Sequence, residues 1–80
     1  MPTDEEIVAA AAVAAEALIL ERFDRTELKD LDISVQFVDG ELRVDVYLDP
    51  RSAAGSMAER TVQDAIAAAE QAVDELFQVE

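Results

Sequence analysis

Two runs of alternating apolar and polar residues lie in the middle of the chain, on either side of Asp39 and Gly40. An Asp-Gly pair between such runs is a strong hairpin signal, because a two-residue type I′ turn needs positive φ at both positions. The pattern predicts strands over about residues 31–38 and 41–49. A register that pairs Val38 with Glu41 places every alternating apolar side chain on one face, and a slip of one residue would destroy this separation. These residues are Leu31, Ile33, Val35, Phe37, Leu42, Val44, Val46 and Leu48.

A helix is predicted before the hairpin, over about residues 4–23. Thr3 and Glu6 have the spacing of a capping box, and three acids in the first turn complement the helix dipole. The connection over residues 24–30 is polar, with Leu28 as its only apolar anchor.

A second helix is predicted after the hairpin, over about residues 57–77, because Ser56 and Glu59 form another capping box. Apolar residues recur at helical spacing and form an expected core stripe. This stripe is Val62, Ala65, Ile66, Ala69, Val73, Leu76 and Phe77. The fold class is therefore α+β: a single domain over residues 1–80, built as a two-layer helix-strand-strand-helix unit in which two antiparallel helices cover one face of an antiparallel β-hairpin.

This unit is expected to be incomplete as a single chain. A two-stranded hairpin is marginal in water, and two helices, each about 10 Å across, overhang it. If Ile7 and Leu18 face the hairpin, together with Ala11 and Ala14, the far side of the first helix is also nearly apolar. It presents Ala9, Ala12, Val13 and Leu20, with Glu16 among them.

Two explanations fit this apolar far side. Alanine is a good helix former that tolerates exposure, whereas contiguous exposed apolar patches usually mark interfaces. We expect a homo-oligomer, most simply a two-fold dimer, formed through the first helices, through edge pairing of hairpins, or through both. Glu41, Arg43 and Asp45 partly guard the second strand against edge pairing.

The residue types give little support for catalysis. The chain has no histidine and no cysteine, and its two glycines cannot form a phosphate-binding loop, so we expect no enzyme activity and no cofactor. The hairpin register brings Asp30, Asp32 and Asp49 to one end of the sheet as a candidate site for Ca²⁺ or Mg²⁺. Such cations normally take six or more oxygen ligands, which favours the interpretation of these acids as a solvated surface.

The formal net charge of −13 excludes two classes of binding partner. It repels nucleic acids and anionic membranes, and residues 7–20 are too short and alanine-rich for a membrane span. The acidic start is unlike a secretory signal, so a cytoplasmic location is expected. Two interpretations of the charge remain: an acidic binding module or DNA mimic for a basic protein partner, or adaptation to molar salt with hydrated K⁺ at the surface. Five arginines against one lysine favour the second.

Three segments resemble a small archaeal and haloarchaeal family, domain-of-unknown-function family 3194: PTDEEIVAAAAVAAEA, DLDISVQFVDGELRVDVYLD and AVDELF. The resemblance covers essentially the whole chain. It carries no catalytic residues onto this sequence. Genes of such proteins often lie near that of a prefoldin beta subunit, which implies at most a role near protein folding, transcription or translation.

Overall fold

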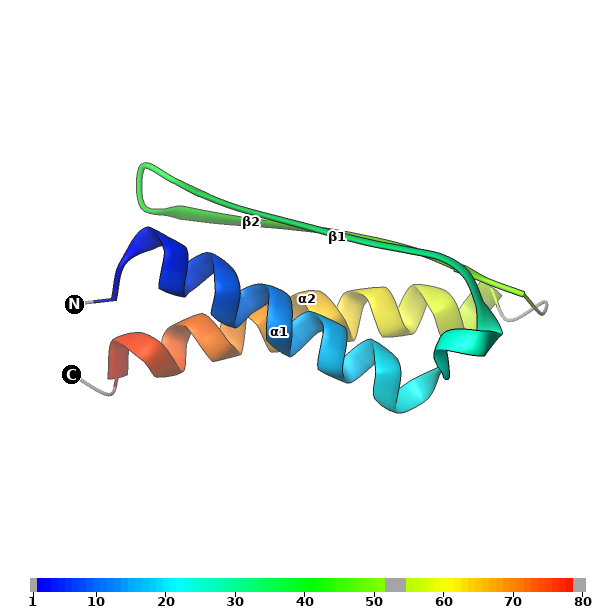
Figure 1. The fold of residues 1–80 in the computed structure, drawn as a ribbon. Helices are drawn as coiled ribbons and strands as arrows, with labels where there is room; N and C mark the ends of the chain where they lie inside the picture. Colours follow the sequence, from blue (N-terminus) through cyan, green and yellow to red (C-terminus); the bar gives the residue numbers. More distant parts are fainter. Residues whose placement is uncertain (1, 52–54, 79–80) are drawn as a thin grey trace.

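The structure, a computed structural model, describes residues 2–51 and 55–78. Helix α1 spans Asp4–Arg22 and helix α2 spans Gly55–Gln78, and the two strands are β1, Leu28–Val38, and β2, Glu41–Pro50. A single 3₁₀ turn, Arg25–Glu27, joins α1 to β1. The helices lie side by side and antiparallel on one face of the hairpin (Figure 1), which confirms the predicted α+β class.

The hairpin has the predicted turn and register. Asp39 and Gly40 both have positive φ, 53° and 78°, and Val38 pairs with Glu41. The apolar pairs predicted from the alternation are all present, from Phe37 with Leu42 to Leu31 with Leu48. The strand β1 begins three residues earlier than predicted, because the anchor Leu28 is buried and pairs with Pro50 across an irregularity before Asp30.

The helix starts differ in how well they follow the sequence signals. The hydroxyl of Thr3 accepts a hydrogen bond of 3.1 Å from the backbone N–H of Glu6, so Thr3 caps the start of α1 as predicted. The prediction that Ser56 caps the second helix was wrong. Helical backbone extends back to Gly55, so Ser56 lies inside the first turn of α2 instead of capping it.

The centre of the core is the seam between the two helices. Buried residues on α1 recur every four positions, at Ile7, Ala11, Ala15 and Ile19. The predicted positions Ala14 and Leu18 are only partly buried, because α1 contacts both α2 and the hairpin and its buried line lies between those two contacts.

On α2 the buried line is Ala58, Thr61, Ala65, Ala69 and Val73. The prediction of Phe77 as a core residue was wrong, since its side chain is 42% exposed. The reason is that this line faces the seam, whereas Phe77 lies to one side of it and borders a cavity beside the hairpin turn.

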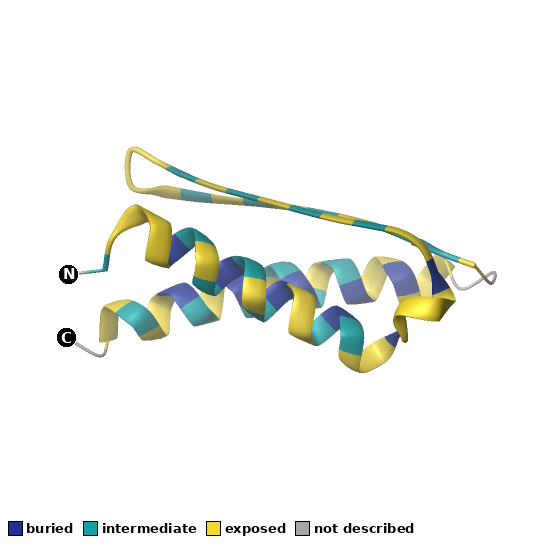
Figure 2. Ribbon diagram, in the orientation of Figure 1, coloured by how far each residue is buried: buried dark blue, intermediate teal, exposed yellow. Residues whose placement is uncertain are grey.

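The inner face of the hairpin is covered incompletely. Its eight apolar residues all pack against the core, and all eight remain only partly buried (Figure 2). The molecule is elongated, 42 × 21 × 19 Å. Its accessible surface is 5452 Å², whereas area scaling gives about 4,700 Å² for a chain of this mass.

Candidate functional site

The surface beside β1 combines a free strand edge with apolar helix residues. We define the β1–α1 flank as the outer edge of β1 together with Ala9, Ala12, Val13 and Glu16 of α1. Ala12 and Glu16 line a cavity of about 300 Å³ with Leu31, Ile33 and Arg25, which places this side of α1 against the edge of β1. Ala9 is exposed and Val13 is 68% exposed. Leu20, the fourth residue predicted for an oligomer contact, is partly buried.

The strand part of this flank is uncharged toward the hairpin turn, while its other end carries Lys29, Asp30 and Asp32. Residues 33–38 of β1 contain no charged residue, no proline and no glycine. Native proteins usually protect a long edge strand with such residues, because its unpaired N–H and C=O groups can pair with another chain. The charge on the helix side is Glu16, which lies 3.7 Å from Arg25 with both side chains exposed.

The surface beside β2 has a different character. We define the β2–α2 flank as the outer edge of β2 together with Glu59, Gln63, Glu70 and Asp74 of α2. Two cavities lie along it, of about 650 Å³ near the hairpin turn and about 340 Å³ further along β2. The larger one is lined by Phe37, Gly40, Leu42, Glu70, Val73, Asp74 and Phe77. The smaller one is lined by Val46, Tyr47, Leu48, Ala58, Glu59, Val62 and Gln63.

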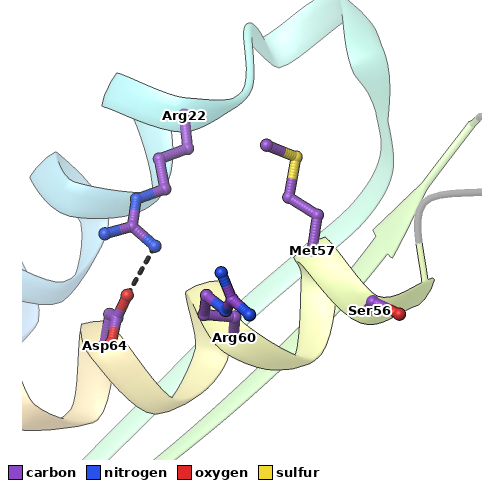
Figure 3. Close-up of a pocket in the computed structure, with 5 residues that line it drawn as sticks. All are labelled: Arg22, Ser56, Met57, Arg60 and Asp64. Carbon is purple, nitrogen blue, oxygen red and sulfur yellow. Dashed lines mark hydrogen bonds and ion pairs between the residues drawn. The ribbon is translucent and has the colours of Figure 1, made fainter.

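A further cavity, of about 460 Å³, lies where α1 ends and α2 begins (Figure 3). Its lining includes two arginines, but Arg22 forms an ion pair of 2.5 Å with Asp64 across the two helices. Ser56 points away from both arginines and from Asp64, the one carboxylate among the residues that line this cavity. The arrangement joins the helices and offers no activated nucleophile.

The three acids of the candidate cation cluster lie at the end of the hairpin away from its turn. Asp30 pairs with Asp49 across the strands, as predicted, while Asp32 pairs with Tyr47. The carboxylate of Asp30 accepts a 2.9 Å hydrogen bond from the backbone N–H of Leu31. Within residues 2–51 and 55–78, no three acids are grouped in a way that could hold a metal ion.

The cavities of the β2–α2 flank were not predicted from the sequence. The available signal was Phe77, an aromatic residue at the end of a helix that the antiparallel fold brings back to the hairpin turn. Phe37 and Leu42 flank that turn and line the same cavity as Phe77. The alternation pattern assigns Phe37 and Leu42 to the core, and helical spacing assigns Phe77 to it.

Comparison with known proteins identifies the family. Residues 3–76 match the family model described as a protein of unknown function, DUF3194. The chain belongs to this family. A similar protein is an uncharacterised protein of Natronomonas pharaonis, 48% identical over 81 residues that cover 96% of this chain and 90% of the relative. No solved structure matches the chain. Neither described helix has both the length and the apolar character needed to span a membrane.

Proposed function

We propose that this DUF3194 protein is a non-enzymatic interaction protein of a halophilic archaeal cytoplasm that acts as a homo-oligomer, most simply a two-fold dimer. The observation that carries the proposal is the inner face of the hairpin. Eight large apolar side chains lie on it, and none is fully buried by the two helices. Each partly exposed apolar side chain retains a favourable transfer free energy that a second copy could release.

The exposed area is of the size that a dimer removes. The accessible surface exceeds the value expected for this mass by roughly 700 Å². A standard protein interface buries about 800 Å² on each partner. The excess is therefore close to what one protomer would bury in a stable two-fold contact.

The β1–α1 flank supports one geometry for this dimer. If β1 pairs with β1 of a second copy, two hairpins become one four-stranded sheet, with the helices of both copies on the same face. Sheets of three or more strands with a covered face are stable, unlike an isolated hairpin. The uncharged stretch 33–38 would lie at the centre, with Ala9 and Val13 of each copy beside it.

Composition supports the remaining parts of the proposal. Nine of the thirteen excess negative charges lie in the first and last twenty residues, which contain no base. Such a surface retains hydrated K⁺ in molar salt, where the Debye length is about 3 Å. The absence of histidine and cysteine removes the commonest general base and the best nucleophile, which supports a role in binding over catalysis.

The test is sedimentation velocity in about 2 M KCl, where charge repulsion is screened, combined with amide hydrogen exchange. We expect a dimer whose amides in β1 residues 33–37 exchange more slowly than those in β2 residues 42–46. The variant Ala9→Arg/Val13→Arg places two large side chains on the flank and should sediment as a monomer. Both positions are exposed in the protomer, so its fold should persist.

The matched control is Ala67→Arg/Gln71→Arg, which adds the same charge at the same spacing on the exposed side of α2. It should remain dimeric. A wild-type protein that sediments as a monomer at every concentration tested would refute the proposal. A dimer that dissociates equally in both variants would show that the β1–α1 flank is not the contact.

A further inference from the structure

We infer that the larger cavity of the β2–α2 flank is a binding site for a basic, extended segment of a partner protein. This site lies on the opposite edge of the hairpin from the proposed dimer contact and does not depend on it. Its floor is apolar and its rim is acidic, a combination that fits the long side chains of lysine and arginine, whose apolar stems and charged ends need different surroundings.

The floor of the cavity is formed by side chains from three elements. Phe37 comes from the end of β1, Leu42 from the start of β2, and Val73 and Phe77 from the last turns of α2. Phe77 is 42% exposed, which is unusual for a large aromatic side chain that has a core next to it. An inorganic cation would gain nothing from contact with these apolar side chains. The stem of a lysine, or an apolar side chain, would cover them and remove them from water.

The rim carries negative charge that the described protein leaves uncompensated. Glu70 and Asp74 line the cavity and are both exposed. The ion pairs between described residues are Arg22 with Asp64 and Arg25 with Glu16, so neither rim acid takes part in one. Residues 61–78 of α2 contain no base at all. Nucleic acids and acidic proteins are repelled by this rim, whereas a basic segment is attracted.

The edge of β2 explains why the segment should be extended. Among the described residues the sheet has two strands and β2 pairs with β1 alone, so its outer edge can accept another strand. Glu41, Arg43 and Asp45 lie on the other face of β2, away from the cavity, where they would meet the remaining alternate side chains of an added strand. A strand placed there would direct alternate side chains into the cavity and toward Glu70 and Asp74.

The test uses a fluorescent eight-residue peptide in which lysine alternates with valine, measured by anisotropy with the full chain in KCl concentrations at which the protein is folded. Glutamine and glutamate versions of the peptide are the charge controls. We expect the lysine peptide to bind, the glutamine peptide to bind more weakly and the glutamate peptide not to bind. Binding of the lysine peptide should weaken as KCl rises, because exposed charges are screened.

Variants locate the site. Glu70→Gln/Asp74→Asn should weaken binding by roughly two- to thirtyfold, the range expected for two exposed ion pairs. Phe77→Ser should also weaken it. The matched control is Glu21→Gln/Glu75→Gln, which removes the same charge from exposed positions outside the cavity and should leave the affinity nearly unchanged. All these positions are exposed, so circular dichroism should show folded protein throughout.

Three results would overturn the inference. Equal binding of the glutamine and lysine peptides would show that charge has no part in it. Equal weakening by the two double variants would mean attraction to net charge without a site. In NMR spectra, peptide-induced shifts at Ala9 and Val13 instead of Gly40 and Leu42 would place the peptide on the other flank. Because the site is separate, peptide binding should survive Ala9→Arg/Val13→Arg, so failure of the dimer proposal leaves this inference testable.

Discussion

The two flanks of the hairpin differ far more than the hairpin itself. Across the strands the inner face is almost symmetric, with Val35 opposite Val44 and Ile33 opposite Val46. The strand edges and the helices both contribute to the difference. Residues 33–38 of β1 are uncharged, whereas β2 carries Glu41, Arg43 and Asp45. Beside β1, α1 presents alanine and valine with a single acid, whereas beside β2, α2 presents acids and glutamine next to apolar residues such as Val73 and Phe77.

This difference decides which flank can contact a second copy. In a two-fold contact the same patch meets itself, so the patch must be complementary to itself. The β1–α1 flank meets that condition, because apolar side chains and the uncharged stretch 33–38 suit their own copy. The β2–α2 flank does not, because Glu70 and Asp74 would face identical acids and lose hydration without gaining a counter-charge. Self-association and recognition of a basic partner are thus assigned to opposite edges.

The largest expected effect is that of salt on stability. Asp64 pairs with Arg22, but Glu70, Asp74 and Glu75 have no base among residues 61–78, so their mutual repulsion opposes folding at low ionic strength. Raising KCl from about 0.1 M to about 2 M shortens the Debye length several-fold. We expect stabilisation of about 2 kcal/mol, or roughly 10 °C in the melting temperature.

Thermal unfolding followed by circular dichroism measures this effect. A melting temperature independent of KCl concentration would contradict adaptation to salt. Because a dimer also melts at a temperature that depends on protein concentration, the salt series must be repeated at two protein concentrations. The salt effect should remain in Ala9→Arg/Val13→Arg, since it does not arise from the β1–α1 flank.

A second prediction compares the strands directly. Val35 and Val44 are the same residue, face each other on the inner face, and are both partly buried. In an isolated chain, replacing either with alanine should cost about 1 kcal/mol, the value for loss of a partly buried valine side chain. In a dimer joined through β1, Val35 becomes central and its loss should cost about 2 kcal/mol.

Urea unfolding at constant KCl gives both values. The difference between Val35→Ala and Val44→Ala should disappear when each is combined with Ala9→Arg/Val13→Arg, because the chain is then monomeric. Equal costs in the otherwise wild-type chain would place the dimer contact somewhere other than the edge of β1. A larger cost for Val44→Ala would place it at β2.

The sequence predicted the hairpin far better than the helix packing, and the reason is periodicity. A period of two allows one register that separates apolar from polar residues, and Phe37 opposite Leu42 follows from it. The helix α1 is apolar almost all round, so no stripe distinguishes Ala14 from Ala15, and the position of α2 decides which is buried. Of the two flanks, the sequence indicated only the apolar residues of α1. The cavities beside β2 were not predictable, because they depend on how the end of α2 meets the hairpin turn.

A third prediction concerns the seam between the helices, which belongs to neither flank. Thr61 is fully buried, and its hydroxyl has no hydrogen-bond partner in the described structure. An unsatisfied buried polar group costs about 1–3 kcal/mol, so Thr61→Val should stabilise the protein by about 1 kcal/mol. Thr61→Ser keeps the hydroxyl, loses a methyl group and should destabilise by a similar amount.

Urea unfolding measures the stability of both Thr61 variants, and sedimentation measures their oligomeric state. Neither variant should change the oligomeric state, since the residue is covered on all sides within one chain. Destabilisation by Thr61→Val would indicate that the hydroxyl has a partner after all. The two Thr61 variants change stability without changing either flank. A change in their oligomeric state would therefore show that stability alone can alter dimerisation.

The smallest expected effect compares one acid from each flank. Glu16 lies 3.7 Å from Arg25, whereas Glu70 pairs with none of the described residues. At about 0.1 M KCl, Glu70→Gln should stabilise the protein slightly by relieving repulsion, and Glu16→Gln should be neutral or slightly destabilising. Exposed pairs contribute about 0.2–1 kcal/mol, so the two variants should differ by about 0.5 kcal/mol. Urea unfolding at low and high KCl resolves this difference, which should vanish at about 2 M KCl because exposed charges are then screened. If it persists there, the flanks differ by packing at these two positions instead of by charge.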